Sequence, residues 1–213
     1  MKKLLLATLF LGCNATHATR EALAINTFKK SNYINKCNIS HDLYRDMHNL
    51  GVRPEVVNAF EKNSKVTCKV LKSKDVIIVD YTKSINDNRL FVVSYGDSSV
   101  KYTAMVSHAF NTGRGNYAKK FSNVPNSNYS SKGLFKIHDR VVRSISPYSF
   151  PVSGLENQNN NAYRRNITIH RSLFDDNDYV GHSEGCFAIT PEAIKKMKEF
   201  NIGGSYLYAY YQS

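Results

Sequence analysis

The stretch that decides the fold reads NITIH at residues 166–170 and GHSEGCFAI at residues 181–189. In the first segment apolar and polar side chains alternate, as they do along a β-strand with one buried face. We therefore expect its two isoleucines to face the core, and Thr168 and His170 to lie on the opposite, accessible face. The second segment begins with a turn and ends in a short apolar run, which predicts an adjacent strand.

The second segment places a cysteine directly after a glycine. Gly185 leaves the backbone free to bring amide N–H groups close to a bound carbonyl, as an oxyanion-stabilising turn requires. A thiol becomes a useful nucleophile when a histidine and such a turn favour the thiolate. We therefore interpret Cys186 as a nucleophile and His170 as its base. Isolated cysteines and histidines are more often structural, so the residues alone leave that alternative open.

The rest of the chain is rich in strand patterns. Further strands are predicted at residues 75–81, 89–95, 101–108, 133–138, 140–145 and 206–211, with Asn-, Ser- and Gly-rich loops at 111–128 and 153–161. Thr190 as N-cap and Pro191 at the first position predict one late helix that ends before Gly203. Many strands with one late helix indicate a mainly β domain.

Two short helices are predicted ahead of the strands. Ser40 opens the first helix. Leu43, Met47 and Leu50 recur at helical spacing, so they should share its buried face. A second helix should start at Pro54, because proline is favoured at the first helical position. Together they predict a helical hairpin packed on the main domain.

The charge balance favours an acidic partner. The 213 residues contain 29 Lys and Arg against 17 Asp and Glu, a formal net charge of +12. Such an excess attracts nucleic acid, anionic lipid or an anionic wall polymer. The charges are scattered, and no arginine-rich stripe or basic motif with interleaved aromatic residues occurs, so we expect no nucleic-acid partner. The 42% hydrophobic content fits a globular chain with a core of its own.

The N-terminus has the layout of a secretory signal peptide. Two lysines precede an apolar run at residues 4–11, and a candidate cleavage site ends at Ala18. No later segment approaches the ~20 apolar residues of a membrane span, so we expect an exported protein of the periplasm or cell envelope without a transmembrane segment. Lipidation at Cys13 is an open alternative. The expected organisation is a signal peptide at 1–18, a helical N-terminal appendage at 19–69 and a catalytic domain at 70–213.

Several motifs in register resemble one family. Residues 183–186 match its Ser-x-Gly-Cys signature, and residues 167–170 match its upstream strand that ends in histidine. Residues 107–113, 121–133 and 154–165 resemble three further motifs of its murein L,D-transpeptidase branch. The sequence is therefore similar to the L,D-transpeptidase (YkuD-type) catalytic domain, from about residue 75 to the C-terminus.

The resemblance implies a β-sandwich-like L,D-transpeptidase catalytic domain that acts on peptidoglycan stem peptides. Cys186 would attack the carbonyl between the L-centre of a diamino acid and D-alanine in a stem tetrapeptide, and His170 would serve as base. Transfer to an amine of a neighbouring stem would give a 3→3 cross-link. Gly185 would help to hold the oxyanion, and Ser183 would position the histidine or the turn, or would cap backbone groups.

The chain departs from the family's pattern near the nucleophile. Phe187 and Ala188 stand where the wider family has an apolar residue and arginine. His182 replaces an arginine of the branch and Arg171 a glycine, and the interval between the histidine and the cysteine is shorter. His182 and Arg171 are therefore candidates for binding a substrate carboxylate. His108 is a further candidate, with a satisfied buried histidine as the alternative.

No cofactor and no metal are expected. His138, His170 and His182 match no zinc spacing, and a thiol nucleophile needs no metal. Two other classes of function stay open. One is a hydrolase on the same fold, either an L,D-carboxypeptidase or an enzyme that cleaves the amide bonds of wall-attached proteins. The other is a non-catalytic wall-binding module. The oligomeric state is not predicted.

A disulfide between Cys37 and Cys68 is expected from cysteine parity. Removal of the signal peptide leaves three cysteines, and pairing these two leaves Cys186 as a free thiol. The bond would stabilise the mature protein by about 2–4 kcal/mol. Thiol titration of the denatured, unreduced mature protein should give one free thiol per chain, whereas three would refute the pairing.

Overall fold

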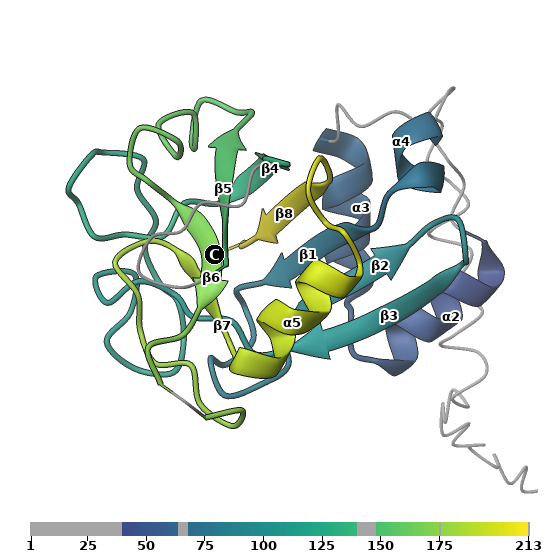
Figure 1. Ribbon diagram of the computed structural model, residues 1–213, viewed down its shortest axis with the longest axis horizontal. Coiled ribbons are helices and arrows are strands. Elements are labelled where there is room, and N and C mark those ends of the chain that lie inside the picture. The colour runs from purple at the N-terminus through teal and green to yellow at the C-terminus, as the bar shows by residue number, and fades with distance from the viewer. Residues whose placement is uncertain (1–39, 64–67, 140–147, 175, 213) are drawn as a thin grey trace, which may run out of the picture. The chain divides into compact units, whose positions relative to one another are not determined.

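The computed structural model describes residues 40–63, 68–139, 148–174 and 176–212 (Figure 1). All of these residues belong to one compact unit of the chain. The expected signal peptide, Cys13, Cys37 and the strand expected at 140–145 lie outside the described residues, as does the side chain of Cys68.

The described part of the chain contains one eight-stranded sheet in the order β3-β2-β1-β8-β4-β5-β6-β7 (Figure 1). Its strands are β1 (Val76–Asp80), β2 (Leu90–Ser94), β3 (Ser99–Ala104), β4 (Gly133–Ile137), β5 (Ser149–Gly154), β6 (Thr168–Arg171), β7 (Phe187–Ile189) and β8 (Tyr206–Tyr210). The β1–β8 and β6–β7 pairs are parallel, and the other pairs are antiparallel. Beyond β3, Val106 forms an antiparallel bridge with Ile189 of β7, so the sheet is nearly closed. The expectation of a mainly β fold is confirmed.

The central strand β1 is buried on both faces. Its sequence VIIVD is a run of four apolar residues followed by Asp80, and all five residues are buried. Ile77 and Val79 belong to the main core, which also contains Met197 of helix α5 (Pro191–Glu199). Because side chains alternate along a strand, Val76 and Ile78 point to the other face. That face carries helices α2 and α3 (Figure 1).

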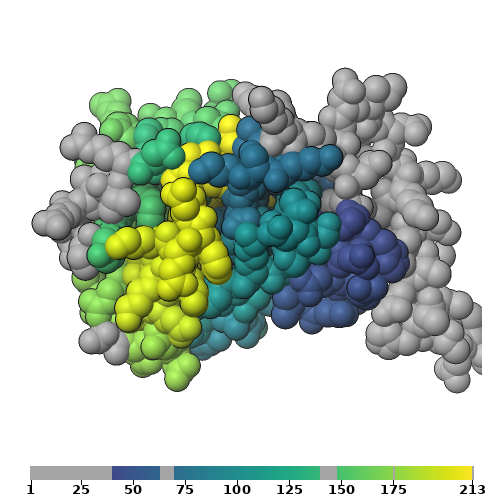
Figure 2. Space-filling model, turned by 45° about the vertical axis from the view of Figure 1, so that its right-hand side comes forward, coloured from purple at the N-terminus to yellow at the C-terminus, as the bar shows by residue number. Residues whose placement is uncertain are grey.

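Helices α2 (His41–Asn49) and α3 (Pro54–Asn63) begin at the residues expected from their capping patterns. The Ser40 hydroxyl accepts a hydrogen bond from the Leu43 amide at 3.1 Å, which satisfies one of the free N–H groups at the helix start. Asp46 of α2 accepts from the Val100 amide of β3 at 2.6 Å. In Figure 2 the purple and blue helical residues lie against the teal residues of the sheet. The proposed division of the chain at residue 70 stays a prediction.

Three local expectations are wrong. Leu50 was expected on the buried face of the first helix, but it is the C-cap residue and is 43% exposed because the helix ends before its side chain turns inward. No element was predicted directly before the strand at 75–81, but Cys68–Ser73 forms the short helix α4. β5 occupies Ser149–Gly154, where no strand was expected. Pro151 within it lacks an N–H, so the sequence pattern does not indicate a strand there. Its carbonyl nevertheless accepts a hydrogen bond from the His138 amide at 2.9 Å.

The late helix follows its sequence signals. The Thr190 hydroxyl accepts from the Ala193 amide at 3.2 Å, and Pro191 occupies the first turn. Ala193, Ile194 and Met197 are buried against the sheet. The helix therefore covers the end of β7 and fixes the chain directly after the candidate nucleophile segment.

Replacing Phe60 of α3 with alanine should strongly destabilise the whole domain. Phe60 is fully buried, and its ring centroid lies 5.6 Å from that of Tyr208 in β8. Truncation of a buried phenylalanine costs about 3–5 kcal/mol, because contacts are lost and a cavity remains. Chemical denaturation of the purified protein measures the change in unfolding free energy.

Leu50→Ala is the matched control, because Leu50 caps the neighbouring helix α2 but is 43% exposed. Its cost should stay below about 1 kcal/mol. Equal stability losses in the two variants would mean that α3 does not contribute to the core in the way the contacts indicate.

Candidate active site

The parallel pairing of β6 with β7 brings the candidate histidine and cysteine together. His170 of β6 lies opposite Ala188 of β7, two residues after Cys186. Ile167 and Ile169 are buried, at 3% and 0% exposed, while His170 is only partly buried. The expected alternation is therefore confirmed, and the accessible face of β6 is turned toward the cysteine.

The orientation of His170 is fixed by its own strand. Its Nδ1 donates a hydrogen bond to the carbonyl oxygen of Arg171 at 2.6 Å. A carbonyl can only accept, so Nδ1 carries the proton of the neutral ring, and Nε2 is the nitrogen with a free lone pair. The ring also hydrogen-bonds the thiol of Cys186. A neutral His170 can therefore take a proton from the thiol.

The pKa values of Cys186 and His170 are both shifted toward the charged forms of the two side chains. Burial by itself raises the pKa of Cys186, but the hydrogen bond and the charge of His170 outweigh it, with further help from Thr168, and the thiol pKa falls below its ordinary value. Burial likewise lowers the pKa of His170, but the bond to Cys186 outweighs it, and the imidazole pKa rises. Both changes favour a thiolate beside an imidazolium.

Two short-range contacts place the sulfur. Thr168 Oγ1 lies 3.9 Å from Cys186 Sγ, and the Asn166 carbonyl oxygen lies 3.7 Å from it. Asn166 precedes β6 with a positive φ of 55°, a conformation that asparagine tolerates better than most residues. The sulfur therefore lies against the start of β6, within reach of the accessible face.

The turn before the cysteine is held by Ser183. Its hydroxyl donates to the carbonyl oxygen of Cys186 at 2.7 Å and accepts from the Gly185 amide at 3.2 Å. Gly185 has a φ of +135°, and a Cβ there would lie 2.9 Å from Ile167 Cδ1. No described residue accepts from the Cys186 amide. Because the Gly185 N–H is already bonded, the Cys186 N–H is the amide available to an oxyanion.

Ser107 is a site residue that the sequence analysis did not assign. It is fully buried, and its hydroxyl donates to the Cys186 carbonyl oxygen at 3.2 Å while accepting from the Ala188 amide at 3.0 Å. Its own amide donates to the Ala188 carbonyl at 2.8 Å. In the sequence, Ser107 is visible only as a serine of the 107–113 motif at the end of an apolar strand pattern. Its hydrogen-bond partners become apparent only from the tertiary pairing.

The three candidate substrate-binding residues differ in position. His108 is fully buried, its Nδ1 accepts from Arg89 Nη2 at 3.0 Å, and its Nε2 donates to the Gly113 carbonyl at 2.8 Å. Burial and the charge of Arg89 lower the pKa of His108 to about 4. This geometry favours the structural alternative for His108. Arg171 contributes its carbonyl to the site through His170.

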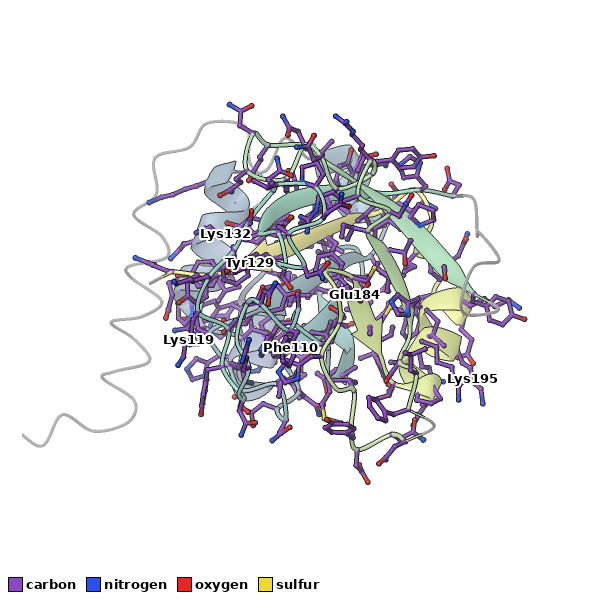
Figure 3. The ribbon with its side chains drawn as sticks, turned by 90° about the vertical axis from the view of Figure 1, so that its left-hand side faces the viewer. Phe110, Lys119, Tyr129, Lys132, Glu184 and Lys195 are labelled. Carbon is purple, nitrogen blue, oxygen red and sulfur yellow. The ribbon has the colours of Figure 1, made fainter. Side chains whose placement is uncertain are left out.

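His182 lies at the rim beside the nucleophile turn. It is partly exposed, and its ring makes edge contacts with the rings of His108 and Phe110 at centroid distances of 4.9 and 5.9 Å. Phe110 donates its amide to the Ser183 carbonyl at 2.9 Å. Figure 3 shows Phe110 and Glu184 on the same face of the molecule. His182 is therefore the candidate that remains close to solvent near the turn.

The family model for the L,D-transpeptidase catalytic domain (YkuD_2) matches residues 50–210. Because this match spans most of the chain, the protein belongs to the L,D-transpeptidase catalytic domain family. The match includes the second N-terminal helix and the whole described sheet. None of the curated proteins matches the chain.

Solved structures with low sequence identity are similar to this chain. An L,D-transpeptidase (Yku) from Stackebrandtia nassauensis is 15% identical, with a TM-score of 0.42 over 89% of this chain and 90% of that one. The helical cell shape determining protein Pgp2 (K307A mutant) from Campylobacter jejuni is 10% identical, with a TM-score of 0.47 over 66% and 48%. An L,D-transpeptidase from Mycobacterium smegmatis is 11% identical, with a TM-score of 0.39 over 65% and 59%. The chain thus spans about half to three fifths of the last two proteins. The family assignment rests on the family model.

Two further features concern the described residues only. None of their helices is both long and apolar enough to cross a membrane. Among them, no group of three or more His, Cys, Asp or Glu side chains is arranged to hold a metal ion.

His170→Gln should raise the pKa of the Cys186 thiol. The imidazole hydrogen bond and charge lower that pKa, so without them burial dominates and the thiolate fraction at neutral pH falls. We expect the pH midpoint for alkylation of Cys186 by iodoacetamide to move upward by about one unit or more. Mass spectrometry of the Cys186 peptide after timed alkylation gives the rate at each pH. An unchanged midpoint would show that the ring does not act on the thiol.

Proposed function

We propose that the protein is a peptidoglycan L,D-transpeptidase with Cys186 as nucleophile and His170 as base. The observation that carries this proposal is the hydrogen-bonded thiol–imidazole pair on the paired strands β6 and β7. The family membership supplies the substrate class, which is the stem peptide of peptidoglycan. The reaction joins the L-diamino acid of one stem to an amine of another and releases D-alanine.

In the first half of the reaction the Cys186 thiolate attacks the carbonyl carbon between the diamino acid and D-alanine. The developing oxyanion accepts a hydrogen bond from the Cys186 amide. The His170 imidazolium donates its Nε2 proton to the amine of D-alanine as the C–N bond breaks. A thioester between Cys186 and the diamino acid remains, and His170 is neutral again.

In the second half an amine from a neighbouring stem attacks the thioester. Neutral His170 takes a proton from the attacking amine at Nε2, whose lone pair is exposed because Nδ1 is bonded to the Arg171 carbonyl. The C–S bond breaks, the thiolate is restored, and a 3→3 cross-link is formed. His182 at the rim is a candidate contact for a carboxylate of either stem.

Water is the competing acceptor, and it would make the protein an L,D-carboxypeptidase. The short interval between His170 and Cys186 favours this second candidate, because a site with less cover admits water more easily. Amide cleavage that detaches wall-bound proteins follows the same first half. Retention of the family motifs around the nucleophile supports transfer as the first choice.

We further propose that the protein acts outside the cytoplasm, in the periplasm or cell envelope. The signal-like segment at residues 1–18 and the substrate class of the family support this location. The formal net charge of +12 would help to keep the enzyme on an anionic wall. The partners are therefore peptidoglycan stem peptides, without nucleic acid.

The test uses disaccharide units that carry tetrapeptides, incubated with the purified protein at high concentration. Mass analysis should reveal a dimer that has lost one D-alanine. If only the monomeric tripeptide forms across a range of acceptor concentrations, the protein is an L,D-carboxypeptidase.

Cys186→Ala is the control for chemistry at the thiol, and it should abolish both products while the thermal unfolding midpoint stays close to that of the wild type. His170→Gln should slow turnover by about 10²- to 10⁴-fold, the usual contribution of a positioned general base. A Cys186→Ala variant that still turns over would refute the mechanism, and a wild type that only binds the units would identify a wall-binding module.

A further inference from the structure

Arg165 makes a three-point contact with the loop that faces the nucleophile turn. Its Nη1 donates to the Ser122 carbonyl at 2.9 Å and to the Ser131 hydroxyl at 2.6 Å, and its Nη2 donates to the Tyr129 carbonyl at 2.6 Å. None of these acceptors carries a negative charge. The guanidinium is partly buried, so its positive charge is neither neutralised by these partners nor fully screened by water.

The loop that Arg165 contacts is itself rigidly bonded. Ser131 donates its hydroxyl to the Ser122 carbonyl at 3.0 Å, and the Ser122 amide donates to the Ser130 carbonyl at 3.1 Å. Ser130 is fully buried, and its hydroxyl accepts from the Ala109 amide at 2.8 Å. Ala109 in turn pairs with Ser183. The guanidinium is therefore bound to a loop that is connected, through Ser130 and Ala109, to the nucleophile turn.

Arg165 also lies directly beside Gly185. A Cβ built on Gly185 would be 3.2 Å from Arg165 Nη2 and 3.1 Å from the Tyr129 carbonyl oxygen. Burial lowers the pKa of Arg165, and negative charge on Cys186 acts against this by raising it. The arginine and the thiol thus interact electrostatically across the glycine.

Two N–H groups of Arg165 remain available. Of its five donors, three are used by the loop, whereas Nε and the second Nη2 hydrogen have no acceptor among the described residues. A guanidinium with unused donors beside a thiolate stabilises negative charge there. His170 loses its charge when it donates its proton to the leaving amine, whereas the charge of Arg165 is permanent.

We propose that Arg165 is a positioning residue for Cys186: its three bonds hold the loop at 122–131 against Gly185, and its fixed charge favours the thiolate. The inference rests on the proposed function only in taking Cys186 as the nucleophile. It assigns a role to a residue of the 154–165 motif that neither the thiol–imidazole pair nor the turn serines fulfil.

The experiment measures alkylation of Cys186 by iodoacetamide in the full mature chain as a function of pH, read by mass spectrometry on the Cys186 peptide. Arg165→Gln removes the charge. Arg165→Lys keeps the charge but lacks the planar guanidinium that makes the three bonds. Arg164→Gln removes an exposed neighbouring charge and is the matched control. We expect the Arg165→Gln midpoint to rise by about one pH unit, which slows alkylation near neutral pH about tenfold. The lysine variant and the control should stay within about 0.3 unit of the wild type.

Thermal unfolding of the same variants separates the effect of the Arg165 charge on the thiol from the effect of its three hydrogen bonds on the stability of the loop. A lower unfolding midpoint for both Arg165 variants, with the alkylation shift confined to the glutamine variant, supports the proposal. An unshifted alkylation midpoint in Arg165→Gln overturns it, and so does an equal shift in Arg165→Lys, because the effect would then come from a disturbed turn. The thiol readout needs no substrate, so a failure of the cross-linking assay leaves this result independent.

Discussion

The parallel pairing of β6 with β7 is the constraint on which the candidate site depends. The two strands are only four and three residues long, and their register sets His170 opposite Ala188. Parallel neighbours require a crossover connection, and the chain supplies it between Arg171 and Cys186. The Ser172 amide donates to the Ile189 carbonyl at 2.7 Å, so the pairing continues past the end of β6. A slip of one residue would turn His170 into the core and separate it from the thiol.

The cysteine carbonyl, rather than the thiol, receives most of the structural support. Ser183 and Ser107 both donate to the Cys186 carbonyl oxygen, one from within the turn and one from the segment after β3. These two bonds fix the peptide plane after the cysteine, and the bond from the Gly185 amide to the Ser183 hydroxyl fixes the plane before Gly185. The intervening plane, which carries the Cys186 amide, therefore has little freedom. The amide of Cys186 is then held in place without a partner of its own among the described residues, and a preformed donor of this kind costs no reorganisation when an oxyanion develops.

Local patterns were sufficient for part of the fold and of the site. The alternation at 166–170 and the Thr190–Pro191 helix start depend on neighbouring residues, and the structure contains both features. The Gly-Cys dipeptide indicated backbone freedom, and Gly185 has a φ of +135°, whereas the role of Cys186 stays a prediction. β5 was missed because Pro151 breaks the strand pattern although only its carbonyl is needed there. The roles of Ser107 and Arg165 could not be predicted in the same way. Their partners lie far away in the sequence, and only the folded sheet brings them together.

A second arginine, Arg89, also donates to uncharged acceptors in a segment that contacts the nucleophile turn. Arg89 is fully buried, and it donates to the carbonyls of Val106 and Lys83 and to His108 Nδ1. Burial lowers its pKa to about 10, so it remains a cation at neutral pH. His108 must be neutral to accept a hydrogen bond from Arg89. A neutral, fully bonded imidazole is compatible with its buried position, so His108 has a structural role. Val106 and His108 flank Ser107, the residue that bonds the cysteine carbonyl. Both arginines therefore hold segments that contact the nucleophile turn through acceptors without a net charge. The charge of Arg89 is balanced by the nearby carboxylates of Asp80 and Asp87, so its contribution to the turn is to hold the backbone on both sides of Ser107.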